Sequence, residues 1–257
     1  MMRDPDATTR ILIGAGSYAD AQTAIHLAEQ LAGMLPTEMG GVLIDDSLFV
    51  GMARLPGQRV ITSNGTLLVA PSASQAQTLF EGDARAFRQT LAKMAQTRTL
   101  KWTFEQRRGD LIGSLCDAAR GWDILLLGYR RLHSRHGRVV VIAPPVEPSL
   151  TLDRLAVDLA DALDTDILTL AVSNGTVSPE EPVQTTSTAS RIELDNEDRL
   201  LSCLNRINAA AVVVDMKSGP LHNQDQLRQL LNAARCPVVV LGATGRNPTS
   251  ETGATHG

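Results

Sequence analysis

The sequence predicts an α/β protein built from two doubly wound, mostly parallel sheets, the first of which lacks its last strand. Three observations predict this class. Short runs of Val, Ile and Leu alternate with longer segments in which apolar residues recur at helical spacing. Aromatic residues make up only 3% of the chain, which indicates an aliphatic core of helices packed on a buried parallel sheet. The order of these segments also repeats along the 257 residues.

The first half of the chain opens with a strand and a helix. The apolar run at 11–13 predicts the strand, and alanine, leucine and isoleucine at helical spacing predict a helix from about 21 to 34. Gly40 and Gly41 then separate the helix from a second strand at 42–44. We therefore expect a βαβ unit with a right-handed crossover.

An irregular insert at about 47–76 interrupts this pattern. Asn64 and Gly65 stand between short apolar runs and predict a small hairpin inside the insert. Beyond it, Asp110 is the expected N-cap of the second of two further helices. The elements expected after the insert are helices at 79–94 and 111–119 and strands at 101–105 and 124–127.

The second half repeats the plan in diverged form. We expect a first domain at 1–137, a second, degenerate domain at 138–242 and a disordered tail at 243–257. A Ser/Thr/Pro/Glu-rich stretch at 173–190 is a connector or a partner-binding segment. The expected strands lie at 139–142, 167–172, 191–194, 211–214 and 237–241, and the expected helices at 152–163, 200–207 and 227–234. Because the first half has no fifth strand, one edge of its fourth strand is left unpaired. We expect the 139–142 strand or a partner chain to pair with that edge.

Composition excludes several classes of function. The net charge of −4 does not suit nucleic acid or an anionic membrane surface as partner. No apolar stretch reaches the length of a membrane span, and the N-terminus has no signal-peptide core, so we expect a cytoplasmic protein. Cys116, Cys203 and Cys236 are too dispersed for a zinc site or a disulfide framework and are expected as reduced core thiols.

The segment RILIGAGSYADAQTA carries the glycine loop that decides the function. Gly14, Gly16 and Ala19 match the G-x-G-x-x-A fingerprint of dinucleotide-binding folds, but Asp45 lies several residues too far along for the usual ribose contact. Two other interpretations stay open. The glycines allow a tight turn from strand to helix, or the amides that open the helix, at Gly16, Ser17 and Tyr18, bind an anion.

A basic link after the fourth strand is a second candidate for the same site. Arg130 and Arg131 follow Gly128, and more arginines and histidines extend the run to Arg138. The carboxyl ends of neighbouring parallel strands meet at one edge of a sheet, so this link and the glycine loop could hold a phosphate or carboxylate together. The alternative is a solvated basic loop. No spacing predicts a catalytic triad or a metal site, and Asp45 with Asp46 has no evident third ligand.

Four segments together resemble the universal stress proteins, in a tandem arrangement that covers nearly the whole chain. They are RILIGAGSYADAQTAIHLAEQLA, GGVLIDD, DLIGSLCDAARGWDILLLGYRR and LRQLLNAARCPVVVLG. The resemblance implies two doubly wound domains that associate within one chain as single-domain relatives do in a dimer.

Departures from the family pattern bear on the ligand. ATP-binding members carry Asp where Gly16 stands, and a second glycine where Arg131 stands after Gly128. The corresponding loop of the second half, at 215–220, has no such motif. The resemblance thus implies the fold together with a degenerate nucleotide site.

The function expected from these observations is a non-enzymatic stress-response or regulatory module that acts through protein partners, a second copy of the chain among them. No cofactor is expected. The alternative is an ATP- or AMP-binding universal stress protein, and a less favoured one is an NAD- or FAD-dependent enzyme. The residues expected to line a ligand site are Gly14, Ala15, Gly16, Ser17, Asp45, Gly128, Arg130 and Arg131.

Overall fold

A computed structural model of the chain describes eight stretches of the sequence. They are residues 9–32, 37–46, 59–61, 67–69, 72–129, 137–144, 149–172 and 190–243. The expected disordered tail beyond Ala243, the greater part of the basic link and nearly all of the Ser/Thr/Pro/Glu-rich stretch therefore lie outside the described residues.

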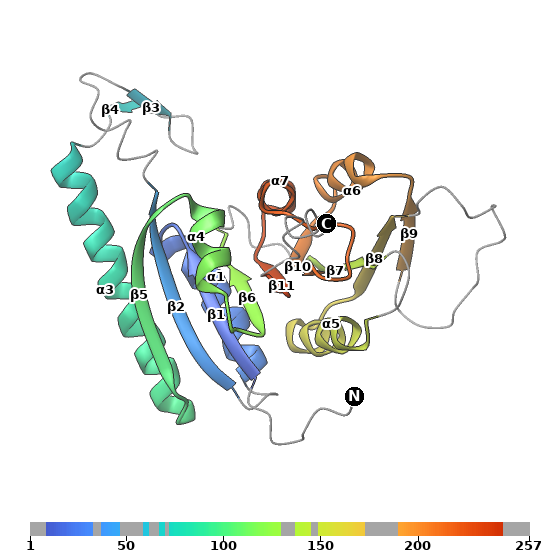
Figure 1. Cartoon of the computed structure of the whole chain (residues 1–257), viewed down its shortest axis with the longest axis horizontal. Coiled ribbons are helices and arrows are strands. Elements are labelled where there is room, and N and C mark those ends of the chain that lie inside the picture. Colours follow the sequence, from blue (N-terminus) through green and yellow to red (C-terminus); the bar gives the residue numbers. More distant parts are fainter. Residues whose placement is uncertain are drawn as a thin grey trace, which may run out of the picture.

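Nine strands form one continuous sheet in the order β5-β2-β1-β6-β11-β10-β7-β8-β9 (Figure 1). Strands of the first half form one parallel run and strands of the second half another. The first run contains β1 (Thr9–Ala15), β2 (Thr37–Asp46), β5 (Trp102–Gly109) and β6 (Ile124–Leu127). The second contains β7 (Arg138–Ala143), β8 (Ile167–Val172), β9 (Ser190–Leu194), β10 (Ala209–Asp215) and β11 (Val238–Leu241). The predicted α/β class with a mostly parallel sheet is confirmed, and the two predicted sheets join edge to edge.

The junction between the runs is the antiparallel pair β6–β11. Val238 pairs with Leu127 and Leu241 with Ile124, and every residue of both strands is buried. The expectation that the 139–142 strand covers β6 is wrong, because β7 pairs on its two sides with β10 and β8. As the first strand of a doubly wound run, β7 is central and has no free edge. By contrast, β11, the last strand of the second run, has a free edge, and this edge pairs with the open edge of β6 in the first run.

Helices cover both faces of the sheet. On one face lie α1 (Tyr18–Ala32), α3 (Ala73–Arg98) and α5 (Leu150–Leu163), and on the other α4 (Leu111–Ala118), α6 (Glu197–Leu204) and α7 (Gln224–Ala234). Successive side chains of a strand point to opposite faces of the sheet, so each buried strand contributes to both hydrophobic cores. Ile11 and Ile13 belong to the core under α1, α3 and α5, and Leu12 belongs to the core under α4, α6 and α7. Among the described residues, no helix has the length and apolarity to cross a membrane.

Two predicted boundaries differ from the structure. The helix expected from 79 begins at Ala73, where Ser72 and Gln75 form a reciprocal capping box. Its first two turns bury no side chain, so they carry no apolar periodicity. Gly40 and Gly41 lie inside β2 instead of before it. A Cβ on Gly40 would lie 2.6 Å from the ring of Trp122, so glycine lets that indole pack on the strand.

The predicted hairpin is present in the insert. The strands β3 (Arg59–Ile61) and β4 (Leu67–Val69) pair antiparallel and form a separate two-stranded sheet. Asn64 and Gly65, on which the prediction depended, fall between these strands and outside the described residues.

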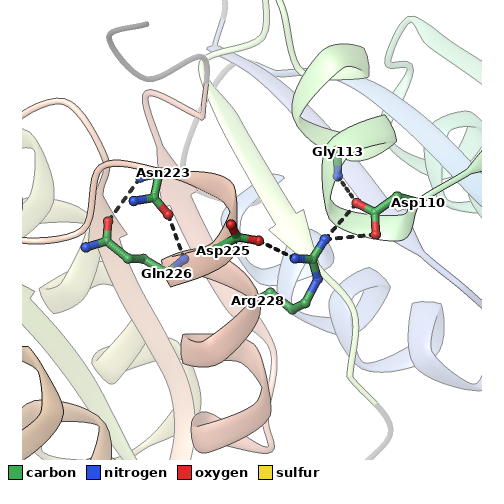
Figure 2. Close-up of polar contacts among 6 residues, drawn as sticks. All are labelled: Asp110, Gly113, Asn223, Asp225, Gln226 and Arg228. Carbon is green, nitrogen blue, oxygen red and sulfur yellow. Dashed lines mark hydrogen bonds and ion pairs between the residues drawn. The ribbon is translucent and has the colours of Figure 1, made fainter. Parts of the chain in front are cut away.

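A polar contact joins the two runs on the face covered by α4 and α7. Arg228 of α7 places one nitrogen 2.8 and 2.9 Å from the two carboxylate oxygens of Asp110 (Figure 2). Asp110 is also the predicted N-cap of α4, since it accepts from the backbone N–H of Gly113 at 2.8 Å. One carboxylate therefore both starts a helix of the first half and binds a helix of the second.

Candidate functional site

The glycine loop lies at the carboxyl edge of the first parallel run, as predicted. Gly14 and Ala15 end β1, and Gly16 with Ser17 leads into α1. On the neighbouring strand β6, Gly128 follows the last residue, and its N–H donates to the carbonyl of Gly14 at 2.8 Å. The structure thus brings the glycine loop and Gly128 together.

Three backbone donors at the N-terminus of α1, those of Tyr18, Asp20 and Ala21, have partners within the chain. Ser17 is the first partner: its Oγ accepts from the N–H of Asp20 at 3.2 Å, and its carbonyl accepts from the N–H of Ala21 at 3.0 Å. The Ser17 hydroxyl in turn donates to the Asp20 carboxylate at 2.6 Å. Such a capped terminus has fewer N–H groups to offer an anion.

A second carboxylate, from another helix, takes the position that a bound anion would take. The N–H of Tyr18, the first residue of α1, donates to Oδ2 of Asp83 in α3 at 3.1 Å. The Tyr18 hydroxyl also hydrogen-bonds the Thr90 hydroxyl of α3 at 2.8 Å. Asp83 and Thr90 are seven residues apart, on one face of α3, so this helix holds the start of α1 at two points. A negative charge at a helix N-terminus is favourable.

The gap between the glycine loop and the link after β6 is filled by backbone. A Cβ on Gly128 would lie 2.5 Å from the carbonyl oxygen of Asp20, so only glycine fits this close to α1. The Thr23 hydroxyl lies 2.9 Å from the carbonyl oxygens of both Asp20 and Tyr129. These contacts tie the start of the link to the first turns of α1, where a phosphate would need space.

The two glycines of the loop have different roles. A Cβ on Gly14 would lie 3.0 Å from Cδ1 of Leu115 in α4 and nearer still to Cδ2, and Leu115 is buried. At Gly16 the nearest heavy atom to a Cβ is Cδ1 of Leu111, at 3.7 Å. Neither glycine has a positive φ. Gly14 is therefore a packing glycine under α4, whereas the space at Gly16 admits a side chain.

Asp45 is paired inside the sheet. Its carboxylate accepts from Nε and Nη2 of Arg108, both at 3.0 Å, across the neighbouring strands β2 and β5. Only 13% of the Asp45 side chain is exposed. The Asp45 carboxylate is therefore bound by the Arg108 guanidinium and is not left free to bind a ribose. The described residues contain no group of three His, Cys, Asp or Glu placed to hold a metal ion.

Of the basic residues in the link, the structure describes Arg138 alone. Arg130 and Arg131, both expected at the site, lie outside the described residues. Arg138 begins β7, which is four places from β1 in the sheet, roughly 19 Å at the usual strand spacing. The structure therefore does not bring Arg138 to the glycine loop.

The corresponding loop of the second half closes on itself. After β10, the Asp215 carboxylate accepts from the N–H of Lys217 and the hydroxyl of Ser218, both at 2.8 Å. The carbonyl of Asp215 accepts from the N–H of Gly219 at 2.7 Å. These bonds form a tight turn that uses the carboxylate internally.

Asp83 and Thr90 were not predicted from the sequence as residues of this site. They lie in a helix more than sixty positions after the loop that they contact. The available signal was a polar pair at seven-residue spacing beside the apolar stripe that holds Ala84 and Phe87. That pattern is common on half-buried helices and does not specify a partner.

Comparisons with known proteins give structural matches alone. No protein-family model matches the sequence, and no curated protein matches it. A universal stress protein from Archaeoglobus fulgidus DSM 4304 matches with 9% identity and a TM-score of 0.47, over 90% of this chain and 95% of that one.

Two further structures match over most of their length. A putative universal stress protein from Pseudomonas aeruginosa UCBPP-PA14 has 11% identity and a TM-score of 0.47, over 92% and 94% of the two chains. The cytoplasmic domain of a prokaryotic cation chloride cotransporter has 9% identity and a TM-score of 0.43, over 94% and 98%. The family that the sequence resembles is thus named among the structures to which this chain is similar.

Proposed function

We propose that this chain is a non-enzymatic regulatory protein of the stress-response type, which acts through protein partners and whose nucleotide site is degenerate. The observation that carries the proposal is the hydrogen bond from the Tyr18 N–H to the Asp83 carboxylate. A nucleotide phosphate at this helix terminus would have to displace a carboxylate held by the same chain and would meet its negative charge.

Two other contacts support the same proposal. Gly128 lies against the backbone of Asp20, which leaves no room for a side chain between Gly128 and the first turn of α1. The Asp45 carboxylate, which a dinucleotide-dependent enzyme would use for the ribose, is bound by Arg108. The proposed location is the cytoplasm, and the proposed partners are proteins, a second copy of the chain included.

Native mass spectrometry of the full chain with ATP, AMP or NAD tests the degenerate site. We expect the bare subunit mass, or whole multiples of it, with no adduct at any nucleotide concentration that leaves a control protein free of nonspecific adducts. An adenine nucleotide adduct that disappears in Gly16→Leu, which fills the loop with an uncharged side chain, would overturn the proposal in favour of the nucleotide-binding alternative. Gly16 suits this purpose because a side chain fits there.

The partner is tested separately. The tagged chain is cross-linked in its own cells, and each candidate partner is then purified and recombined with it. We expect at least one protein to form a complex of defined stoichiometry from the purified components. If no candidate recombines, and the chain does not form a dimer, the proposed mode of action is wrong.

A further inference from the structure

A groove on the second half of the sheet lies away from the glycine loop. It has a volume of about 410 Å³ and opens at the amino ends of β7, β8 and β9. Its apolar lining comes from Leu168, Ile192 and Ile207. Leu168 and Ile207 belong to the core under α6 and α7, and Ile192 is on the same face because it pairs with Leu170. The groove therefore extends an apolar core out to the solvent.

The back wall of the groove is fixed and has its polar backbone groups satisfied. The carbonyl of Gly137 accepts from the Thr165 hydroxyl at 2.6 Å, and the N–H of Arg138 donates to the carbonyl of Asn208 at 3.0 Å. A Cβ on Gly137 would lie 2.7 Å from that same carbonyl oxygen, so glycine allows the two strands to meet here. Because these backbone groups are already hydrogen-bonded, a ligand in the groove would contact side chains.

One cation stands at the rim of this apolar surface. The exposed side chain of Arg138 lines the groove, and the described residues provide it with no ion pair and no side-chain hydrogen bond. By contrast, Arg108, Arg120, Arg191 and Arg228 each pair with a carboxylate. At the nearby end of α6, the carbonyls of Cys203 and Leu204 accept from the backbone N–H groups of Arg206 and Ile207. Ser190 and Asn208 also line the groove.

We propose that this groove binds a small alkyl carboxylate. The carboxylate pairs with the Arg138 guanidinium, and the alkyl chain lies on Leu168, Ile192 and Ile207. Among the described residues, the groove has one guanidinium above an aliphatic surface. This suits a monoanion with a hydrocarbon tail, whereas a free phosphate would gain nothing from the apolar residues. The volume falls within the range of small-molecule sites. This site is additional to the function proposed above and does not depend on the closed glycine loop.

Isothermal titration of the full chain with acetate, hexanoate, octanoate, hexanol and inorganic phosphate tests this site. We expect one saturable site per chain, with affinity that rises along the carboxylate series by up to about fourfold for each added methylene. Hexanol should bind at least about tenfold more weakly than hexanoate because it has no charge to pair with Arg138. Phosphate should not compete with octanoate.

Two variants assign the site to these residues. Arg138→Gln should weaken octanoate binding about tenfold or more, and Ile192→Glu should abolish it by placing a carboxylate on the apolar surface. Both side chains are exposed, so both variants should fold. Arg154→Gln is the control, because Arg154 is an exposed arginine on α5, across the sheet. Equal binding of hexanol and hexanoate, competition by phosphate, or equal losses in Arg138→Gln and Arg154→Gln would each refute the proposal.

Discussion

The N–H of Tyr18 and the carboxylate of Asp83, 65 residues apart in the sequence, form a hydrogen bond of 3.1 Å that links the start of α1 to α3. Asp83→Ala removes this acceptor and its charge from the helix terminus. We expect a loss of about 1 kcal/mol in the free energy of unfolding, measured by urea denaturation. Asp83→Asn keeps an acceptor oxygen and should lose less. Equal losses in both variants would mean that the charge, and not the hydrogen bond, stabilises the terminus.

Alanine at the two loop glycines separates packing from ligand binding. Gly14→Ala forces a Cβ against the buried Leu115, and overpacking of this kind costs about 1–3 kcal/mol. Gly16→Ala meets no atom nearer than 3.7 Å and should change stability by less than about 0.5 kcal/mol. Urea denaturation of both variants measures the difference. Similar stability in the two would contradict the packing role of Gly14.

The contact between Arg228 and Asp110 is testable by a double-mutant cycle. Asp110→Asn keeps the N-cap of α4, since Asn caps as well as Asp, while it removes the charge that Arg228 binds. Both side chains are about half exposed, so we expect a coupling of about 0.2–1 kcal/mol with Arg228→Ala, falling at high salt.

The matched control for this cycle is the pair Arg120–Asp117. It has the same 2.8 Å separation, lies within one turn and is more exposed, so its coupling should be smaller. A larger coupling for Arg120–Asp117 would show that the contact between α4 and α7 contributes nothing specific.

The cysteines should react in the order of their exposure. Burial, with the charges of Asp117 and Asp110, raises the pKa of the Cys116 thiol from its ordinary 9.0 to about 11. Since the thiolate is the reactive form, Cys116 should label slowly with a disulfide reagent at pH 8 in the folded protein. The half-buried Cys203 should label first, and Cys203→Ala should lose that fast phase. Fast labelling that survives in Cys203→Ala would contradict the burial of Cys116 and Cys236.

The same raised pKa predicts how stability depends on alkaline pH. Between pH 9 and 11 the unfolded chain loses the Cys116 proton while the folded chain keeps it, so the free energy of unfolding falls as the pH rises. The stabilisation that comes from this raised pKa is fully present below pH 9. In Cys116→Ala, the stability should fall less steeply across this window than in the parent chain, whatever its value at pH 7. Parallel slopes would contradict the assignment.

The sequence by itself determined the local elements and their class. The strand β8 spans the predicted 167–172, and Asp110 caps α4 as predicted, because apolar periodicity and capping act over a few residues. The meeting of Gly14 and Gly128 was also predictable, because the ends of adjacent parallel strands share one edge of the sheet.

Tertiary structure alone decided which edges pair and which charges meet. The β6–β11 junction joins two strands that lie more than a hundred residues apart, and the apolar run of β11 does not specify which strand it pairs with. Likewise, Asp83 could have faced solvent, but the packing of α1 against α3 places it at the N–H of Tyr18. Such contacts depend on how whole helices and sheet edges fit together, and no local pattern of residues encodes that fit.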